Sequence, residues 1–329
     1  METQVPDKNL ALDLVRITES AALASARWLG KGDKDAGDNA AVQAMRLTFR
    51  SIRIEGTVVI GEGAKDNAPM LENGEKVGAG SGPQVDVAVD PVEGTRLLAN
   101  GRPNAISTVA IAPAGSMYDP HGSFYMQKLV VPKEAKDAVH LDSPVQDNLK
   151  RIAKALDKDV DDLIVFVLDK PRHKKLIDEI RETGARIELH TDGDVAGALM
   201  ACDPRSQVDV MMGTGGTPEA VLTACALKAY GGEMFCRMDP QSKKEEHAII
   251  DAGKDLREIF TTKTLVKSDD TFFAATGISG GTFLKGVLYD KRGAYTHSMV
   301  LRGKTGSIRY IEAYHHWEKL MQFSSVKYD

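Results

Sequence analysis

The segment Val85–Thr95 reads V-D-V-A-V-D-P-V-E-G-T and predicts the centre of the fold. Valine stands at every second position up to Val89, which is the period of a β-strand with one apolar face. Proline has no N–H group to give to a neighbouring strand, so we expect the strand to stop at Pro91. Asp90 would then lie at the end of the strand, where side chains can converge on a ligand.

Oxygen ligands gather directly after this strand. Glu93 follows Asp90 closely, Gly94 frees the backbone, Thr95 adds a hydroxyl, and the carbonyl of Val92 lies between the two acids. Two carboxylates this close repel each other unless a cation neutralises them. An oxygen-only set of ligands suits Mg²⁺ or Mn²⁺ rather than a soft metal. An Asp-Pro pair is also common in ordinary turns, so this stretch alone leaves both a metal site and a turn open.

Length and composition describe an ordinary globular protein. The chain has 329 residues, which is enough for about two domains of ~150 residues each. Hydrophobic residues make up 42% and charged residues 27%, and the formal net charge is −5. The absence of a basic block argues against a nucleic-acid partner. No apolar run approaches ~18 residues, so we expect no membrane span.

The cysteines and the N-terminus suggest a reducing compartment. Cys202, Cys225 and Cys236 are odd in number and show no C-x-x-C spacing, which argues against a disulfide framework or a zinc site. The first residues contain neither the basic segment nor the apolar segment of a secretion signal. We therefore expect a cytoplasmic protein.

Three acids lie between two predicted N-terminal helices. The helices are expected over Asn9–Leu29 and from about Ala40 to Ile52, and Asp33, Asp35 and Asp38 precede the second. Asp38 at or near the N-cap would explain one acid structurally. It would not explain all three, so a metal-binding or water-binding role for at least one of them stays open.

A glycine-flanked acid follows the next predicted strand. Thr57–Ile60 ends in G-E-G, with Glu62 at its centre. Glycines on both sides let the backbone approach whatever Glu62 contacts. The alternative is a hairpin turn with a solvated glutamate, although such turns favour Asn-Gly or Asp-Gly.

The second part of the chain alternates between predicted helices and strands. Helices are expected at 147–155, 173–183, 195–202 and 220–230, and strands at 106–111, 125–131, 163–168, 186–189, 208–212, 272–275 and 296–301. The segment 233–247 is predicted to be a polar loop. Three of the strands lead into polar clusters before a helix, and open α/β sheets bind ligands beyond the carboxyl ends of their strands.

Two of these clusters contain candidate binding residues. Lys170 and Arg172 stand where the positive end of a helix dipole is expected, and a bound anion would relieve that conflict; a solvated helix start is the alternative. Thr217 is the expected N-cap of the last helix in this series. Glu219 would then lie in the first turn, where compensation of the dipole alone could also explain an acid.

Eight motifs in order resemble class II fructose-1,6-bisphosphatase. They are G-D-K-x-x-G-D, V-I-G-E-G, A-P-M-L, D-P-V-E-G-T, Y-M-Q-K, K-P-R-H, D-G-D-V and G-G-T-P-E, and the resemblance runs from about Val15 to Tyr314. D-P-V-E-G-T also resembles the signature of the lithium-sensitive metal-dependent phosphatase superfamily.

The resemblance implies an α/β fold of the layered α/β/α/β/α sugar-phosphatase type, with a mixed N-terminal sheet followed by a smaller α/β half. It implies that residues 1–140 carry most metal ligands, and that residues 141–329 carry the sugar-phosphate contacts and Glu219. It also implies cytoplasmic gluconeogenesis, dependence on Mg²⁺ or Mn²⁺, a sugar bisphosphate substrate, and a homodimer or homotetramer.

The resemblance also assigns residues. The metal ligands fall on Asp38, Glu62, Asp90, Glu93 and Glu219, and the catalytic threonine falls on Thr95. The substrate contacts fall on Glu93, Gly94, Thr95, Tyr125, Lys170, Pro171, Arg172, Asp192, Gly193, Asp194 and Gly216.

The implied reaction removes the 1-phosphate of fructose 1,6-bisphosphate, and several alternatives stay open. Thr95 could attack directly, could orient a water molecule, or could simply cap the turn after Gly94. Another phosphatase of the superfamily would act on sedoheptulose bisphosphate, inositol monophosphate or an adenosine bisphosphate. A protein that only binds a cation or a sugar phosphate would need the carboxylates but would have no use for Thr95.

Overall fold

The computed structural model describes residues 9–61, 71–120 and 123–323. Glu62, a predicted metal ligand, therefore lies outside the described residues. The α-helices are α1 (Ala11–Ser25), α2 (Lys34–Phe49), α3 (Thr95–Ala99), α4 (Val145–Ala155), α5 (Lys174–Glu182), α6 (Asp194–Cys202), α7 (Thr217–Tyr230), α8 (Lys243–Asp251), α9 (Thr262–Leu265) and α10 (Trp317–Phe323).

The strands form two mixed sheets. They are β1 (Glu55–Ile60), β2 (Lys76–Val77), β3 (Gln84–Glu93), β4 (Ile106–Pro113), β5 (Tyr125–Val131), β6 (Ile164–Leu168), β7 (Arg186–His190), β8 (Val210–Gly216), β9 (Glu233–Met238), β10 (Phe272–Gly277), β11 (Leu288–Tyr289), β12 (Gly293–Arg302) and β13 (Ser307–His316). The first sheet has the order β11-β12-β10-β4-β3-β1-β2, with β13 paired to β12. The second has the order β7-β6-β8-β5-β9.

The first sheet combines early and late strands of the chain. The late strands β10 and β12 join the first sheet, because β10 pairs with β4 on one side and with β12 on the other. The first sheet thus takes strands from both ends of the described chain, whereas the second uses only the middle. The division of the chain into residues 1–140 and 141–329 remains a prediction.

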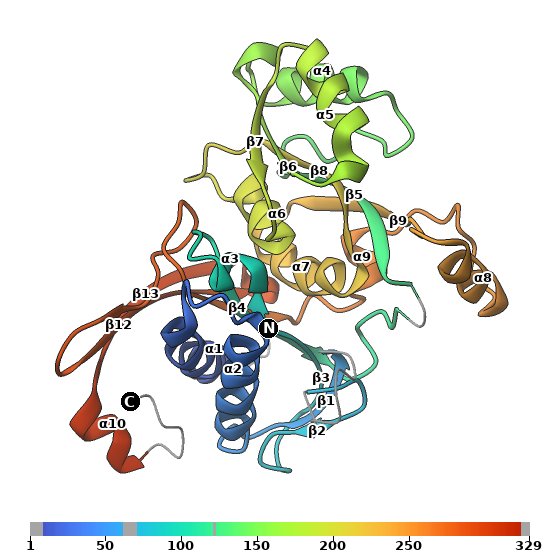
Figure 1. Cartoon of the computed structure of the whole chain (residues 1–329). Helices are drawn as coiled ribbons and strands as arrows, with labels where there is room; N and C mark the ends of the chain where they lie inside the picture. The colour runs from blue at the N-terminus through green and yellow to red at the C-terminus, as the bar shows by residue number, and fades with distance from the viewer. Residues whose placement is uncertain (1–8, 62–70, 121–122, 324–329) are drawn as a thin grey trace, which may run out of the picture.

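Three hydrophobic clusters explain the layers. Helices α1 and α2 cover one face of the first sheet, and Ile17, Phe49 and Val87 lie in the core between them. Helices α6 and α7 lie between the two sheets, and α4 and α5 cover the outer face of the second, with Ile152 and Val165 in that core. Figure 1 shows these five layers from α1 and α2 up to α4 and α5. The predicted α/β/α/β/α architecture is confirmed.

Strand β3 differs from the prediction at its end. It passes Pro91 and continues to Glu93, because its register with β4 shifts between Asp90 and Glu93. An irregular stretch of this kind removes the need for a ladder N–H group at one position, so a proline is tolerated there.

Two helices begin earlier than predicted. Helix α2 begins at Lys34, and its N-cap is Asp33, whose Oδ1 accepts the N–H of Ala36 at 2.9 Å. The capping explanation for Asp38 is therefore wrong, since that residue lies inside the helix. Strand β8 extends through the glycine run to Gly216, where it still pairs with β5. Helix α7 begins at the next residue, Thr217, so Gly216 rather than Thr217 is its N-cap.

The segment 233–247 was predicted as a loop and instead contains β9 and the start of α8. Met234, Cys236 and Met238 alternate as buried residues on β9, which pairs with β5. The Ser242 hydroxyl then caps α8 by accepting the N–H of Glu245. The ten-residue strand β13 was also not predicted, and it pairs with β12 along its whole length.

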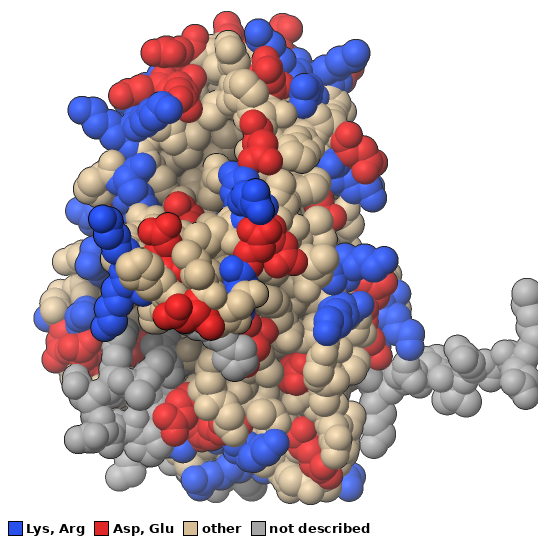
Figure 2. All heavy atoms as spheres, turned by 90° about the vertical axis from the view of Figure 1, so that its right-hand side faces the viewer, with Lys and Arg blue, Asp and Glu red and all other residues tan. Residues whose placement is uncertain are grey.

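The surface and the cysteines bear on partners and compartment. Lysine and arginine side chains are interspersed with acids over the described residues of one face (Figure 2). No helix in the described part of the chain has both the length and the apolar character to cross a membrane. The three cysteines are free and buried. The absence of a nucleic-acid partner stays a prediction.

Candidate active site

Three acids converge where the first sheet meets the middle helical layer. One carboxylate oxygen from each of Asp90, Glu93 and Glu219 lies within 4.8 Å of the others. Asp90 and Glu93 stand at the irregular end of β3, whereas Glu219 lies in the first turn of α7. The N–H of Val92 donates to Oδ1 of Asp90 at 3.1 Å, which fixes the corner between the first two acids.

Glu93 is the most enclosed of the three. Its side chain is buried, and its Oε1 accepts the N–H of Val195 at 3.1 Å from the first turn of α6. Burial, together with the charges of Asp194 and Glu219, raises the pKa of Glu93 well above its usual range. A bound cation would offset this concentration of negative charge.

Glycines on β8 provide the room for these carboxylates. A methyl group at Gly216 would overlap the carboxylate of Glu219, and one at Gly215 would overlap that of Asp194. The G-G-T-P-E motif therefore has a steric reason, because the backbone of β8 must approach the acids closely.

The donor set fits a divalent metal ion. All three groups are carboxylates, and neither a histidine nor a cysteine belongs to this cluster among the described residues. Hard divalent cations take oxygen ligands of this kind. Asp38 is buried on α2, which packs against α3, but its carboxylate is not one of the three at this spacing. The ligand role of Asp38 stays a prediction.

Thr95 is the first residue of the short helix α3. Gly94 is the N-cap, with a positive φ of 90° that favours glycine, and its carbonyl accepts the N–H groups of Leu97 and Leu98. Gly94 rather than Thr95 is the N-cap residue, so the N-cap role considered for Thr95 is wrong. Thr95 follows the end of β3 by two residues.

The structure joins several predicted substrate contacts at the second sheet. The guanidinium of Arg172 donates to the carbonyl of Thr214 from Nε at 3.1 Å and from Nη2 at 2.7 Å. The same group lies 5.3 Å from the ring centroid of Tyr125. Pro171 precedes Arg172 in a short 3₁₀ turn after β6. Arg172 and Tyr125 thus meet at the end of β8 that leads to Gly216.

A second part of the predicted set surrounds the start of α6. Lys170 Nζ lies 3.9 Å from Oδ1 of Asp192, and Gly193 is the N-cap residue of the helix that Asp194 begins. Burial raises the pKa of Asp192, and the charge of Lys170 opposes that rise. This cluster adjoins the acid corner through the bond from Val195 to Glu93.

Two residues of the site region were not singled out from the sequence. His173 is buried, with Nδ1 donating to the Leu168 carbonyl and Nε2 accepting the N–H of Thr214, both at 2.7 Å. Burial lowers the pKa of its imidazole, as the neutral form in these two bonds requires. Lys128 is buried on β5 beside Asp194. A lysine on the same face of a predicted strand as Met126 and Val130 was the available signal for it.

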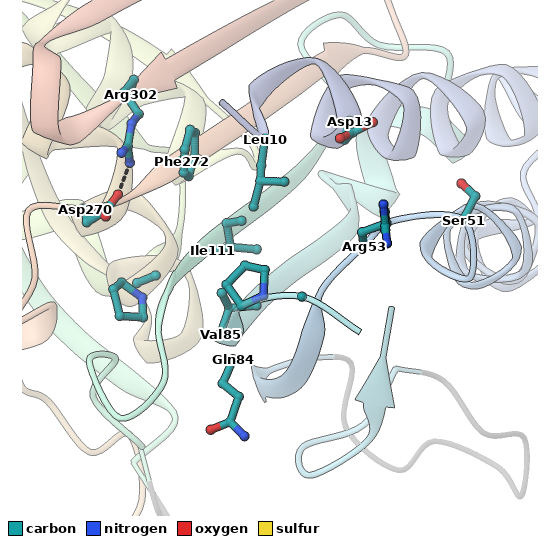
Figure 3. Close-up of a pocket in the computed structure, with 14 residues that line it drawn as sticks. Leu10, Asp13, Ser51, Arg53, Gln84, Val85, Ile111, Asp270, Phe272 and Arg302 are labelled. Atoms are coloured by element: carbon teal, nitrogen blue, oxygen red, sulfur yellow. Dashed lines mark hydrogen bonds and ion pairs between the residues drawn. The ribbon is translucent and has the colours of Figure 1, made fainter. Parts of the chain in front are cut away.

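A separate cavity lies at the opposite end of the first sheet. Its volume is about 680 Å³, and Figure 3 shows Leu10, Val85 and Ile111 gathered in it near the ion pair of Arg302 with Asp270. It adjoins the start of β3 and the end of β4, whereas the acids stand at the end of β3. The cavity is therefore distinct from the acid cluster.

Comparison with known proteins agrees with this geometry. The profile of a family described as "Bacterial fructose-1,6-bisphosphatase, glpX-encoded" matches residues 8–315. "Fructose-1,6-bisphosphatase 1 class 2" of Escherichia coli K12 is 41% identical over 95% of this chain and 96% of its own length. Proteins named "Fructose-1,6-bisphosphatase class 2" from Escherichia coli O6:H1 and Shigella flexneri have the same identity and coverage. This chain belongs to the bacterial, glpX-encoded fructose-1,6-bisphosphatase family.

Proposed function

We propose that this chain hydrolyses the 1-phosphate of fructose 1,6-bisphosphate and releases fructose 6-phosphate and inorganic phosphate, as a step of gluconeogenesis. The observation that carries the proposal is the convergence of Asp90, Glu93 and Glu219 beside Thr95, in a chain that belongs to this family along nearly its whole length. A protein that only bound a cation would have no use for a hydroxyl at this corner.

The acid cluster is the proposed metal site. Asp90, Glu93 and Glu219 would hold Mg²⁺ or Mn²⁺, and Asp38 and Glu62 complete the proposed ligand set. The bound ion would offset negative charge on the phosphoryl oxygens and the leaving oxygen. Backbone hydrogen bonds hold two of these carboxylates in place, because Glu93 accepts the N–H of Val195 and Asp90 accepts that of Val92.

Thr95 is the proposed catalytic residue. Hydrolysis breaks the ester P–O bond, adds the oxygen of water to phosphorus and transfers a proton to the sugar oxygen. Gly94 places Thr95 at the start of α3, directly after the acidic end of β3. In this role the hydroxyl acts on the attacking group.

The second sheet and the start of α6 form the proposed sugar-phosphate site. Lys170 and Arg172 supply positive charge, and the Tyr125 ring flanks the guanidinium. Arginine suits the phosphate that is not cleaved, because its planar group binds phosphate through two parallel hydrogen bonds. The other proposed contacts are Glu93, Gly94, Thr95, Pro171, Asp192, Gly193, Asp194 and Gly216.

Turnover by the purified protein tests the proposal. Fructose 1,6-bisphosphate should release phosphate in the presence of Mg²⁺ or Mn²⁺, and a coupled assay should detect fructose 6-phosphate. Chelation should abolish the reaction and added metal should restore it. Full activity in rigorously metal-free buffer would contradict the metal assignment. Faster turnover of sedoheptulose bisphosphate or inositol monophosphate would replace the proposed substrate.

Oligomeric state, compartment and superfamily are also part of the proposal. A homodimer or homotetramer should be seen by light scattering, and a monomer under assay conditions would contradict it. The free, buried cysteines support a cytoplasmic location. Membership of the lithium-sensitive superfamily predicts inhibition by Li⁺ in competition with Mg²⁺.

A further inference from the structure

Lys128 is a buried cation that the proposed mechanism does not use. It lies on β5 between Met126 and Val130, which belong to the core of the middle layer, and only 3% of its surface is exposed. A buried ammonium group is unfavourable unless it is paired. Its Nζ donates to Oδ2 of Asp194 at 2.6 Å, and the Asp194 side chain is almost as enclosed.

The start of α6 joins this ion pair to the acid cluster. Asp194 begins α6, and the next residue, Val195, donates its N–H to Glu93. A Cβ atom at Gly215 would lie 3.2 Å from the Lys128 ammonium and would overlap the Asp194 carboxylate. A glycine therefore leaves room for the pair at this position of β8.

The charge of Lys128 also reaches the metal-ligating acids. Burial disfavours the ammonium form, but the charges of Asp194 and Glu219 outweigh burial and hold the pKa of Lys128 above its usual value. Asp194 in turn acts on Glu93. Because Lys128 neutralises Asp194, the net negative charge around a bound divalent cation would come from the ligand carboxylates alone.

We propose that Lys128 is a positioning residue that sets the net charge of the metal site by neutralising Asp194. The inference rests on the proposed function for the presence of a metal site. It adds that the fourth acid of the corner is cancelled by a resident cation. The affinity of the site for a divalent ion is therefore limited by Lys128 as well as by its ligands.

Calorimetric titration of the substrate-free protein with Mn²⁺ tests the role of Lys128. The two single variants change the charge of the pair in opposite directions. Lys128→Met exposes the charge of Asp194 and should tighten Mn²⁺ binding by roughly three- to tenfold, the scale of one added charge near a divalent ion in a partly solvated site. Asp194→Asn leaves the ammonium unpaired and should weaken binding by a similar factor. The double variant should return to within about twofold of the parent, because the net charge of the pair is again zero.

The opposite signs separate a charge effect from a structural effect. If the pair only supported the fold, all three variants would weaken Mn²⁺ binding, and that result would overturn the inference. Unchanged affinity in both single variants would overturn it as well. If Lys128→Met does not fold, Asp194→Asn and the double variant still decide the outcome, because removing both partners of a buried pair is often tolerated.

A second lysine–aspartate pair, in which the aspartate is buried and the lysine is exposed, provides the control. Lys158 Nζ lies 2.6 Å from Oδ1 of Asp209 at the other end of the second sheet, so Lys158→Met should leave the Mn²⁺ titration unchanged. Since the titration contains no substrate, its outcome is separate from that of the proposed function. Normal turnover by the parent protein, with unchanged Mn²⁺ affinity in every variant, would refute the role of Lys128 alone. Shifts of opposite sign without bisphosphatase turnover would refute the proposed substrate alone.

Discussion

The two sheets contribute to the candidate site in different ways. The first sheet concentrates reactive groups in one short run, since Asp90, Glu93 and Thr95 lie at the end of β3 and the start of α3. The second sheet contributes space at the glycines of β8 and positive charge after β6. Helices α6 and α7, between the sheets, carry Asp194 and Glu219 into the same corner. Changes that reach Thr95 or the acid cluster should therefore lower kcat, and changes to the positive charge after β6 should mainly raise KM.

The largest effect is expected at Thr95, on the side of the first sheet. Thr95→Ala should lower kcat by roughly 10²- to 10⁴-fold, the usual loss for a positioned catalytic group. Because Gly94 rather than Thr95 is the N-cap residue of α3, the Tm should stay within a few degrees of the parent. Thr95→Ser keeps the hydroxyl and should retain appreciable activity. Retention of most of the kcat by the alanine variant with saturating metal would remove the catalytic role.

Next in size is the effect expected at Gly216, where the second sheet makes room for an acid of the cluster. Gly216→Ala would push the Glu219 carboxylate away, and a displacement of about 1 Å can cost roughly 10²-fold in rate. The added methyl meets the end of a flexible side chain, so the protein should remain folded while Mn²⁺ binding weakens. Gly280→Ala is the control, because its nearest neighbour is an atom 3.6 Å away. Equal effects of the two substitutions would contradict the steric argument.

The acid corner could be predicted because most of its residues are close together in the sequence. D-P-V-E-G-T contains two carboxylates and a hydroxyl within six positions, and the structure brings Asp90 and Glu93 together with the predicted Glu219. The continuation of β3 past Pro91 could not be predicted, since tolerance of a proline depends on the register of β4. Lys128 was missed for a similar reason, because its partner Asp194 is distant in sequence.

The architecture was predictable in part. The alternation of helices and strands in the middle of the chain identified most elements of the second sheet, but the charged residues of β9 hid the buried alternation of Met234, Cys236 and Met238. The pairing of β10 with β4 is a long-range contact that no local pattern encodes. The five layers were expected from the family resemblance rather than from periodicity.

At Arg172 the comparison predicts an effect on KM. Arg172→Ala should raise KM for fructose 1,6-bisphosphate by roughly one to two orders of magnitude, equivalent to about 1.5–3 kcal/mol for hydrogen bonds to a charged group. Fructose 1-phosphate has no second phosphate, so its turnover should change much less. Arg172→Lys should be intermediate, because it keeps the charge and loses the paired donors. Equal losses on both substrates would assign Arg172 to the reacting phosphate or to the fold.

Glu19 is a second buried acid with a raised pKa, and it lies on α1, away from the acid cluster. Glu19 on α1 accepts a hydrogen bond from Thr296 at 3.1 Å and lies 3.8 Å from Nε2 of His315. Burial raises its pKa to about 7, although the Thr296 bond and the charge of Arg16 oppose the rise. Burial also lowers the pKa of His315, so a neutral ring faces this carboxyl at pH 7 and above.

Glu19→Gln should therefore leave turnover unchanged and alter only the pH dependence of stability. In the parent, the pKa of Glu19 is higher in the folded than in the unfolded state, so the fold loses stability as pH rises from about 4.5 to about 7 and then stays at the lower level. Glutamine cannot ionise and keeps an acceptor for Thr296. The variant should gain on the order of 2 kcal/mol over the parent at pH 8, and clearly less at pH 5, in urea unfolding experiments. The same difference at both pH values would show that burial does not keep Glu19 protonated in the fold.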